Sequence, residues 1–442
     1  MILSSLAAAL LATLALAHGG RHSHAHPHAH SQALDTAALP GASAPPALYA
    51  SLFPLSAISL PADSRMAVQQ ARNSRYLTSL NSSRLACLHT SAANLTGTWE
   101  KPSCIPYDHP QYWGHYLGHW LSAAALSIQS GSGGAALASK AEAMVATMGA
   151  AQAAWTAAGE AGFLFPYANT SSFAALAQGR NCVPVCVPFY VMHKMLAGLL
   201  DMHSRAGSAQ ALAIASALGN WVAGYVAGVL ATGGQAAWQS ALNTEWGGMN
   251  DGLRNLARAS GDARHAATAG FFVHWAWTDP LVESVDVLQD FHANTHIPEI
   301  IGDLNGYILT GNDTQAAIVD HFLDMLQANH SYATGGSNDH EYWGLARMLG
   351  DAMNADTEET CTQYNILKTV SQRFSLDGSV RWSDWYARAL YGGMIGNQAI
   401  SGQWQDSDTV GFHYMLPLGG ASLHKPWGDS AQGFPCCWGT SC

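Results

Sequence analysis

Apolar residues recur at helical spacing in block after block from about residue 63 onward. Successive apolar positions fall three or four residues apart, which places them on one face of an α-helix. The alternation typical of strands is nearly absent before residues 409–423. The pattern predicts roughly a dozen helices in an all-α fold. The clearest lie at 65–80, 112–129, 137–155, 189–206, 209–230, 249–261, 263–276, 295–311, 314–327, 361–374 and 383–398.

The joins between these helices are rich in Gly, Pro and Asn, and several also carry polar and aromatic side chains. Four stand out, "LNTEWGGMND", "HANTHIPE", "TGGSNDHEYWG" and "TEETCTQYN". Helices with such ends are more typical of a toroid of paired helices than of a compact bundle. A toroid forms its cavity where alternate loops and helix ends converge, so we expect function in these joins.

Composition excludes some classes of protein. Hydrophobic residues make up 48% of the chain and charged residues 11%, which indicates a globular protein with a large core. The net charge is −11 and there is no basic run, so a nucleic acid is excluded as a partner.

The first 62 residues are predicted to lie outside the folded domain. Residues 1–17 form an apolar run ending in Ala15-Leu16-Ala17, an A-x-A pattern typical of a secretory signal peptide. The run is too short and too Ala-rich for a membrane anchor. Residues 18–62 are rich in His, Pro and Ala and predict a disordered linker before a domain at 63–442. Five N-glycosylation sequons support an extracellular or cell-wall location: Asn81, Asn94, Asn169, Asn312 and Asn329.

The eight cysteines allow two interpretations. Glu359 and Cys361 form an E-x-C motif at the head of a helix, and Cys436-Cys437 follows near the end of the chain. Three thiolates and one carboxylate are ligands that Zn²⁺ accepts. In a secreted protein each cysteine can instead form a disulfide elsewhere, and spacing alone does not decide. The remaining cysteines offer such pairs, Cys87 with Cys104 and Cys182 with Cys186, which would leave Cys442 over.

Two glutamates are candidates for acid–base chemistry. Glu341 lies among aromatic residues with little positive charge nearby, an environment that raises the pKa of a carboxyl group. Glu245, in "NTEWGG", is a second candidate, although a helix-cap or buried structural carboxylate explains it equally well. Five histidines also occur in the polar joins, and any single one is more often structural than functional: His115, His119, His193, His292 and His296.

Seven strings, in order, carry a resemblance to one family. They are "GHYLGHWLSAAA", "FYVMHKMLAGLLD", "NTEWGGMNDGL", "HANTHIPEIIG", "TGGSNDHEYW", "EETCTQYNILK" and "PCC", and they cover about residues 110–440. The chain resembles the β-L-arabinofuranosidases of glycoside hydrolase family 127, which is related to family 146.

The resemblance implies both a fold and a mechanism. It implies an (α/α)6 barrel and an exo-acting, retaining enzyme that releases β-linked L-arabinofuranose from glycans. It also implies Cys436 as the nucleophile and Glu341 as the general acid/base. Zn²⁺ would be held by Glu359, Cys361, Cys436 and Cys437, and the sugar by His119, His193, His296 and Tyr414. We also expect Glu245 and Trp246 to contact the substrate, and Trp113, Trp246 and Trp343 are candidates for stacking on sugars.

One departure from the family leaves alternatives open. The β-sandwich domains that follow the barrel in the family are expected to be missing, because the chain stops just after the Cys-Cys turn. A truncated relative that binds glycans without catalysis would share every motif. Another enzyme of the (α/α)6 barrel, such as a lyase or an unsaturated-uronyl hydrolase, would need Arg or Lys for uronate carboxylates, where these joins carry His, Glu and Trp.

Overall fold

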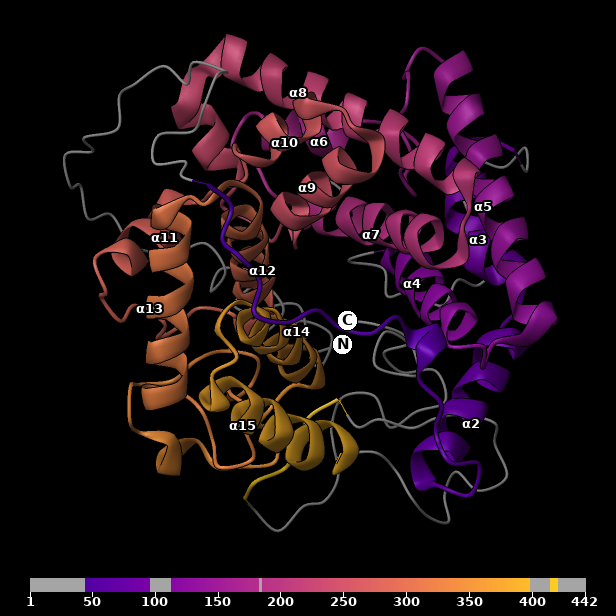
Figure 1. Cartoon of the computed structure of the whole chain (residues 1–442). Helices are drawn as coiled ribbons and strands as arrows, with labels where there is room; N and C mark the ends of the chain where they lie inside the picture. Colours follow the sequence, from indigo (N-terminus) through magenta and orange to yellow (C-terminus); the bar gives the residue numbers. More distant parts are fainter. Residues whose placement is uncertain (1–43, 96–112, 183–184, 398–413, 420–442) are drawn as a thin grey trace, which may run out of the picture. The chain divides into compact units, whose positions relative to one another are not determined.

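The computed structural model describes residues 44–95, 113–182, 185–397 and 414–419, and every structural statement below concerns these residues (Figure 1). All of them belong to one compact unit, Pro40–Cys442. The predicted signal peptide, residues 18–43 of the predicted linker, and Cys104, Cys436, Cys437 and Cys442 lie outside the described residues. Residues 44–62 of that linker are described, and the amide of Tyr49 donates to the carbonyl oxygen of Ser375 at 2.8 Å, so this part of the linker contacts the domain.

The described chain is helical, which confirms the predicted all-α class. It contains isolated β-bridges but no named strand. Three short 3-10 or π segments accompany the α-helices: η1 (Leu55–Ala57), η3 (Leu349–Ala352) and η4 (Ala389–Ile395). The α-helices are α2 (Arg65–Ser79), α3 (Ser82–Ala92), α4 (His115–Gln129), α5 (Gly134–Ala157), α6 (Ser171–Leu176), α7 (Pro188–Ala206), α8 (Ala209–Ala241), α9 (Met249–Ser260), α10 (Ala263–Ala269), α11 (Trp275–Val282), α12 (Ala293–Thr310), α13 (Asp313–Asn329), α14 (Thr360–Asp377) and α15 (Val380–Arg388).

The predicted helices agree with the structure except at a few places. Helix α10 ends at Ala269 and α11 begins at Trp275, whereas the periodicity predicted one helix over 263–276. Gly270 is the C-cap residue of α10, with right-handed backbone angles of φ −64° and ψ −18°. Helices α3, α6 and α11 were not predicted from the pattern.

Local capping explains where many helices begin and end. The side chains of Ser64, Asn81, Ser208 and Asn312 accept backbone N–H hydrogen bonds at the starts of α2, α3, α8 and α13. Such caps satisfy N–H groups that a helix leaves without a partner. At the C-terminal ends of four helices the chain turns at a glycine with a left-handed backbone conformation. These are Gly207 after α7, Gly261 after α9, Gly311 after α12 and Gly378 after α14.

The helices form two layers. Helices α4, α7, α9, α12 and α14 contact one another in that order, and each also contacts the helix that follows it, namely α5, α8, α10, α13 and α15. The first set is the more buried, as α4 and α12 illustrate. Figure 1 shows the succession, with α4, α7, α9, α12 and α14 inside α5, α8 and α13. This pairing is the arrangement of an (α/α) toroid.

Helices α4 and α7 cross very closely because glycine lies at the contact. A Cβ atom on Gly118 would lie 2.1 Å from the carbonyl oxygen of Lys194, and one on Gly198 would lie 2.5 Å from the carbonyl oxygen of Gly118. Either distance is far shorter than a real contact. The close crossing brings the first two turns of each helix together, and these turns carry His115, His119 and His193.

The hydrophobic core divides into two clusters along the chain. The first contains residues of α2 to α10, and the second contains residues of α11 to α15 and η4. Three residues from the later part of the chain, Cys361, Tyr414 and Met415, nevertheless belong to the first cluster. The start of α14 and the segment 414–419 therefore come late in the chain but pack against the core cluster of its first half.

Helix α8 is the longest and most apolar helix. Its length and its mean hydropathy of 1.4 would suffice to cross a membrane, but about 39% of its most apolar window is buried inside the fold. It contacts α5, α7, α9 and α10 as a helix of the outer layer.

A network of buried polar side chains lies between α9 and α12, below their first turns. Asn305 donates to Asp251 at 2.8 Å and to Asn255 at 3.1 Å, and Asn255 donates in turn to Asp251. Arg254 donates to the carbonyl oxygen of Gly302. Gln315 of α13 donates to Asp303 at 3.1 Å. We call this set (Asp251, Arg254, Asn255, Asp303, Asn305 and Gln315) the interior network.

Candidate active site

The predicted site residues gather at the starts of the inner helices. His292 is the N-cap residue of α12 and Glu359 the N-cap residue of α14. His193 lies in the second turn of α7, and Glu245 lies in the loop before α9. The N-terminal end of a helix carries a partial positive charge, so carboxylates are favoured there. The fold therefore brings residues that are up to about 170 positions apart in the sequence to one end of the inner layer.

Tyr414 joins the two central carboxyl groups. Its hydroxyl group contacts an oxygen of Glu341 closely and lies 3.2 Å from Oε1 of Glu359. A phenol has one hydrogen to donate, so it bonds one carboxyl group at a time. The segment of Tyr414 is fixed by backbone contacts, since the amide of Thr360 donates to its carbonyl oxygen at 2.7 Å. The structure thus places the predicted acid/base, a predicted zinc ligand and a predicted sugar contact together.

Glu341 is presented by a tight turn. Asn338, His340 and Glu341 all have positive φ, at 77°, 48° and 72°. Such angles are uncommon for residues other than glycine and persist where surrounding contacts hold them. One of these contacts is the amide of Ala293, the first residue of α12, which donates to the carbonyl oxygen of Glu341 at 2.8 Å. The side chain of Glu341 stays 33% exposed, so a substrate can reach it.

Glu359 and Cys361 form the described part of the predicted metal site. Both side chains are buried, and the Cys361 thiol forms a hydrogen bond with Glu359. Thr362 also donates to Glu359, at 3.1 Å. Burial and the neighbouring charge of Glu341 raise the pKa of Glu359 to about 8, against the opposing effect of His292. A carboxylate in this position favours a cation beside it, and a thiol with a carboxylate is a donor set that Zn²⁺ accepts.

The described residues alone do not complete a metal site. Within them, no group of three or more His, Cys, Asp or Glu side chains lies close enough to hold a metal ion. The two other predicted ligands, Cys436 and Cys437, lie outside the described residues. The pair that is present, Glu359 and Cys361, fits two of the four predicted positions.

His292 is a site residue whose role the sequence did not reveal. Its Nε2 lies 3.2 Å from Oε2 of Glu341, and its Nδ1 lies 3.1 Å from the amide of Thr295 and 2.9 Å from the Thr295 hydroxyl group. Burial lowers the pKa of His292, but the hydrogen bond to Glu341 and the charges of Glu245, Glu359 and Glu341 outweigh it and raise this pKa to about 9. The available signal was the string "HANT", in which a histidine takes the place of an N-cap residue three positions before a threonine.

Glu245 is the third carboxyl group of the cluster. Burial raises its pKa, while His292 and Lys194 act in the opposite direction, and Thr295 forms a hydrogen bond with it. Lys194 is buried, and its Nζ lies 4.5 Å from the centre of the Tyr190 ring. Thr295 thus lies between Glu245 and His292, and the three carboxyl groups surround one imidazole and one ammonium group.

Two predicted histidines are held neutral by burial. Burial lowers the pKa of His193 far below its usual range, and Lys194 and Lys368 lower it further. Its ring faces the next loop, because a Cβ atom on Gly247 would meet its Nδ1 at 2.7 Å. Burial likewise lowers the pKa of His296 to about 3. Nδ1 of His296 bonds the carbonyl oxygen of His292 at 2.8 Å, so Nδ1 carries the hydrogen and Nε2 can accept.

The remaining predicted residues lie deeper in the fold. His119 is buried on α4 with its ring 5.5 Å from that of His115. Trp246 is 1% exposed and packs on Phe272. Trp343 is also buried, stacked on Trp277 with ring centres 6.1 Å apart. Contact of these side chains with a sugar stays a prediction.

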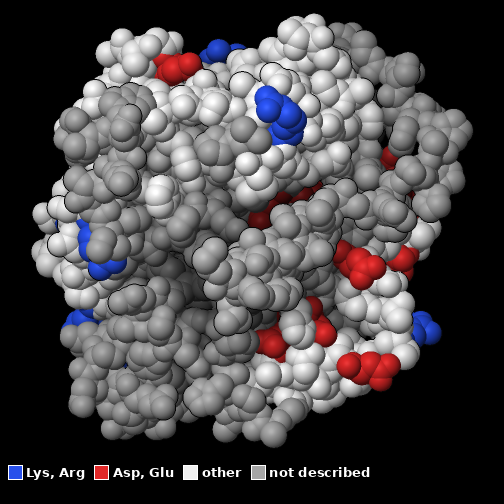
Figure 2. All heavy atoms as spheres, turned by 180° about the vertical axis from the view of Figure 1, so that it is seen from behind, with Lys and Arg blue, Asp and Glu red and all other residues white. Residues whose placement is uncertain are grey.

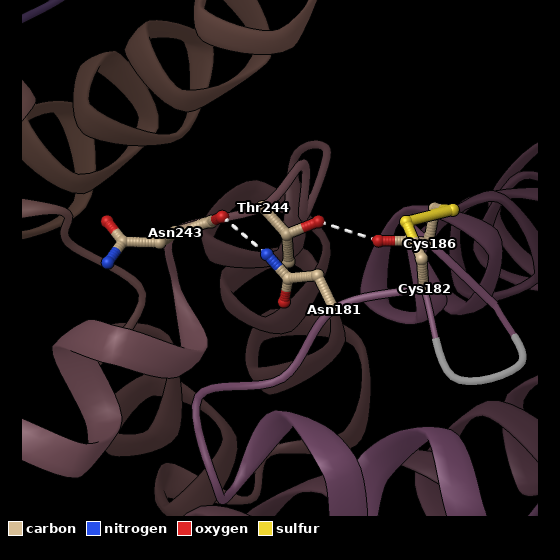
Figure 3. The surroundings of a disulfide bond; sticks show 5 residues. All are labelled: Asn181, Cys182, Cys186, Asn243 and Thr244. Carbon is tan, nitrogen blue, oxygen red and sulfur yellow. Dashed lines mark hydrogen bonds between the residues drawn. A yellow bond between two sulfur atoms is a disulfide. The ribbon is translucent and has the colours of Figure 1, made fainter. Parts of the chain in front are cut away.

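A disulfide supports the loop that carries Glu245 (Figure 3). Cys182 and Cys186 are bonded to each other, one of the pairs that the sequence offered. The hydroxyl group of Thr244 donates to the carbonyl oxygen of Cys186 at 2.7 Å, and the side chain of Asn181 donates to the carbonyl oxygen of Asn243 at 2.8 Å. The disulfide-bonded turn therefore anchors the two residues directly before Glu245. Cys87 is also in a disulfide, with a partner outside the described residues.

Charged side chains are unevenly spread over the described surface. On the face shown in Figure 2, some acidic side chains lie in recesses and others on the open surface, and the few Lys and Arg side chains are scattered. A phosphate-binding surface needs clustered positive charge.

The fold and the carboxyl-rich site define the chain as a helical-toroid protein with the residues of a glycosidase. Residues 61–442 match the model of the β-L-arabinofuranosidase catalytic domain of glycoside hydrolase family 127, and the chain belongs to this family. No protein in a collection of curated sequences matches it.

Solved structures support the same fold at low sequence identity. A GH127 β-arabinofuranosidase is 19% identical with a TM-score of 0.60, covering 87% of this chain and 59% of its own. A GH127 β-L-arabinofuranosidase from Geobacillus stearothermophilus T6 is 14% identical with a TM-score of 0.55, covering 79% and 55%. A structure described as a glycoside hydrolase is 14% identical with a TM-score of 0.50, covering 78% and 54%. The chain thus spans less than two thirds of the length of each of these proteins.

Proposed function

We propose that this chain is the catalytic part of a retaining exo-glycosidase that releases β-linked L-arabinofuranose from glycans. The observation that carries the proposal is the contact of the Tyr414 hydroxyl group with both Glu341 and Glu359, beside Cys361. This contact joins the predicted acid/base, Glu341, to Glu359 and Cys361, two predicted ligands of the zinc ion that would hold the nucleophile. A double-displacement reaction requires an acid/base and a nucleophile in one site.

In the proposed reaction Glu341 transfers the proton. In the first step Glu341 protonates the departing glycosidic oxygen while the Cys436 sulfur bonds the anomeric carbon and the glycosidic C–O bond breaks. In the second step Glu341 takes a proton from water, the water oxygen bonds the anomeric carbon, and the C–S bond breaks to return the thiolate. Two displacements at one carbon retain its configuration.

Four residues would hold Zn²⁺: Glu359, Cys361, Cys436 and Cys437. A bound Zn²⁺ keeps its thiol ligands deprotonated at neutral pH, which supplies the thiolate that the reaction needs. Thr362 and Tyr414 orient the Glu359 carboxyl group by their hydrogen bonds. Hydrogen bonds from neighbouring residues to a metal ligand fix the direction in which that ligand points.

The surrounding histidines suit a neutral sugar. His193 and His296 are kept uncharged by burial, and a neutral imidazole offers a donor or an acceptor to a hydroxyl group without attracting anions. This character argues against uronate substrates, which would be bound by Arg or Lys.

Hydrolysis of p-nitrophenyl β-L-arabinofuranoside, with and without a chelator, tests the proposal. We expect turnover by the untreated chain, loss of turnover after zinc removal, and about one zinc ion bound per chain. Cys436→Ser should abolish turnover while the circular dichroism of the helices stays unchanged. Turnover that survives either the chelator or this substitution would contradict the zinc-thiolate mechanism.

We also propose that the protein is secreted and N-glycosylated. The sequons at Asn81, Asn94 and Asn169 lie at exposed positions. The other two are less accessible, since Asn312 is buried and the side-chain nitrogen of Asn329, where a glycan would attach, donates to Asp286 at 2.7 Å. We therefore expect glycans only at the first three, which mass spectrometry of peptides from the secreted chain can check. A glycan at Asn312 would contradict this assignment.

A further inference from the structure

His292 has two separate sets of contacts, one on each ring nitrogen. On one side, Nδ1 meets the amide of Thr295 at 3.1 Å, so the imidazole caps the first turn of α12. On the other side, Nε2 faces Oε2 of Glu341 at 3.2 Å. One side chain therefore both begins a helix and touches the proposed acid/base.

The cap determines what Nε2 can do. The amide of Thr295 always carries a hydrogen, so in the neutral ring Nδ1 is the acceptor and the single ring hydrogen lies on Nε2. If the ring is charged, Nδ1 carries a hydrogen as well, which the hydroxyl oxygen of Thr295, 2.9 Å away, can accept in place of the amide cap. Nε2 therefore offers a hydrogen to Glu341 in either charge state.

The backbone holds the same two residues together. The carbonyl oxygen of Glu341 accepts the amide of Ala293, the residue after His292, at 2.8 Å. His292 and Tyr342 form an antiparallel bridge, with their rings 5.1 Å apart at a steep angle. The first turn of α12 and the positive-φ turn of Glu341 thus form one local unit, in which the imidazole cannot move away from the carboxyl group independently.

We propose that His292 is a positioning residue for Glu341, an inference that rests on the proposed glycosidase function. Its Nε2–H fixes Oε2 of the carboxyl group, while the Tyr414 hydroxyl group contacts the other oxygen. Donors on both oxygens set the plane of the carboxyl group. Each oxygen keeps a second lone pair, so the proton for the substrate can be given and taken without breaking this arrangement.

Two substitutions separate the cap from the positioning contact. In His292→Asn the side-chain oxygen takes the place of Nδ1 and keeps the cap, because Asn is among the best N-cap residues, but the side chain is too short to replace Nε2. In His292→Gln the amide nitrogen reaches the place of Nε2 and can donate to Glu341, while the cap is lost. A structural role alone predicts the larger loss of function for Gln, and a positioning role predicts it for Asn.

The kinetic test uses two substrates that differ in the proton their leaving group needs. On methyl β-L-arabinofuranoside, whose leaving group must be protonated, we expect His292→Asn to lower kcat about 100-fold with KM nearly unchanged. On the p-nitrophenyl glycoside the loss of kcat/KM, which reports the first step alone, should be at least tenfold smaller than on the methyl glycoside, because nitrophenolate leaves without a proton. His292→Gln should keep more than a tenth of the wild-type kcat on both substrates, with a lower melting temperature. Equal losses on the two substrates, or a larger kcat loss in His292→Gln than in His292→Asn, would overturn the proposal.

A second readout keeps this inference separate from the proposed function. A wild-type chain that hydrolyses no arabinofuranoside contradicts the proposed function, and the positioning contact is then read from ¹⁵N NMR of labelled histidine. We expect Nε2 of His292 to carry a slowly exchanging hydrogen whose resonance shifts in Glu341→Gln. A non-protonated Nε2, or a resonance that Glu341→Gln leaves in place, would refute the contact itself.

Discussion

Two clusters of carboxyl groups balance their charges in opposite ways. One is the candidate site with Glu341, at the end of the inner layer, and the other is the interior network. In the interior network, amide groups of Asn255 and Asn305 donate to Asp251, and Gln315 donates to Asp303. The Arg254 guanidinium group attracts both carboxylates. Donors and a permanent positive charge thus match the buried acids, as a structural network requires.

The site lacks this balance. Glu245, Glu341 and Glu359 share His292, and the raised pKa values of Glu245, Glu359 and His292 show that protons are held where charge is crowded. Crowded groups with shifted pKa values are typical of active sites, because a proton can then move at little cost. Burial raises carboxyl pKa values in both clusters, but only in the interior network do amide groups and a guanidinium group match the carboxyl groups as donors.

The largest expected difference comes from Glu341→Gln. Without an acid/base group, turnover of the p-nitrophenyl and methyl arabinofuranosides should fall by about 10² to 10⁴. The free energy of unfolding should change by less than about 1 kcal/mol, because Gln keeps an acceptor and removes one like charge. Glu283→Gln, at an exposed carboxylate after α11, is the matched control and should leave turnover unchanged. A Glu341→Gln chain that is fully active would place the acid/base elsewhere.

A smaller effect, on stability alone, is expected for Asp303→Asn. Burial raises the pKa of Asp303 from 3.8 to about 6, against the opposing effects of Arg254 and Gln315. The folded state therefore binds a proton more tightly than the unfolded state, and the wild type loses stability as pH rises from about 4 to about 6. The loss is on the order of 2 to 3 kcal/mol, and Asn lacks the titrating group while still accepting from Gln315.

Urea unfolding at pH 4.5 and pH 7 measures this effect. The difference in stability between the two pH values should shrink in Asp303→Asn by comparison with the wild type. Asp324→Asn, at a surface residue paired with Arg381, serves as the control and should keep the wild-type difference. An unchanged difference in Asp303→Asn would contradict the raised pKa of Asp303 in the folded state.

Much of the fold could be predicted because the signals are local. The apolar spacing of 189–206 or 361–374 depends only on which face of a helix is buried, and α7 and α14 follow it closely. The pattern failed at 263–276, where Gly270 ends one helix and another begins at Trp275. Short helices such as α6 carry too few apolar positions to show a period.

The candidate site was predicted less completely. Glu341, Glu359 and Cys361 were candidates from their residue types and surroundings, a family resemblance gave their roles and added Tyr414, and the structure brings the four together. The role of His292 was missed because histidine is not a usual N-cap residue, and because its partner Glu341 lies 49 residues away.

The sequence by itself determined the helices, their caps and the chemical types available at their ends, because each of these depends on neighbouring residues. Only the tertiary structure decided which of those groups meet. The close crossing at Gly118 and Gly198, the turn at Glu341 and the return of Tyr414 to α14 are contacts between distant segments. Proton transfer depends on such contacts, since the pKa of a carboxyl group and the direction of a hydrogen are set by neighbours that the chain brings together only when it folds.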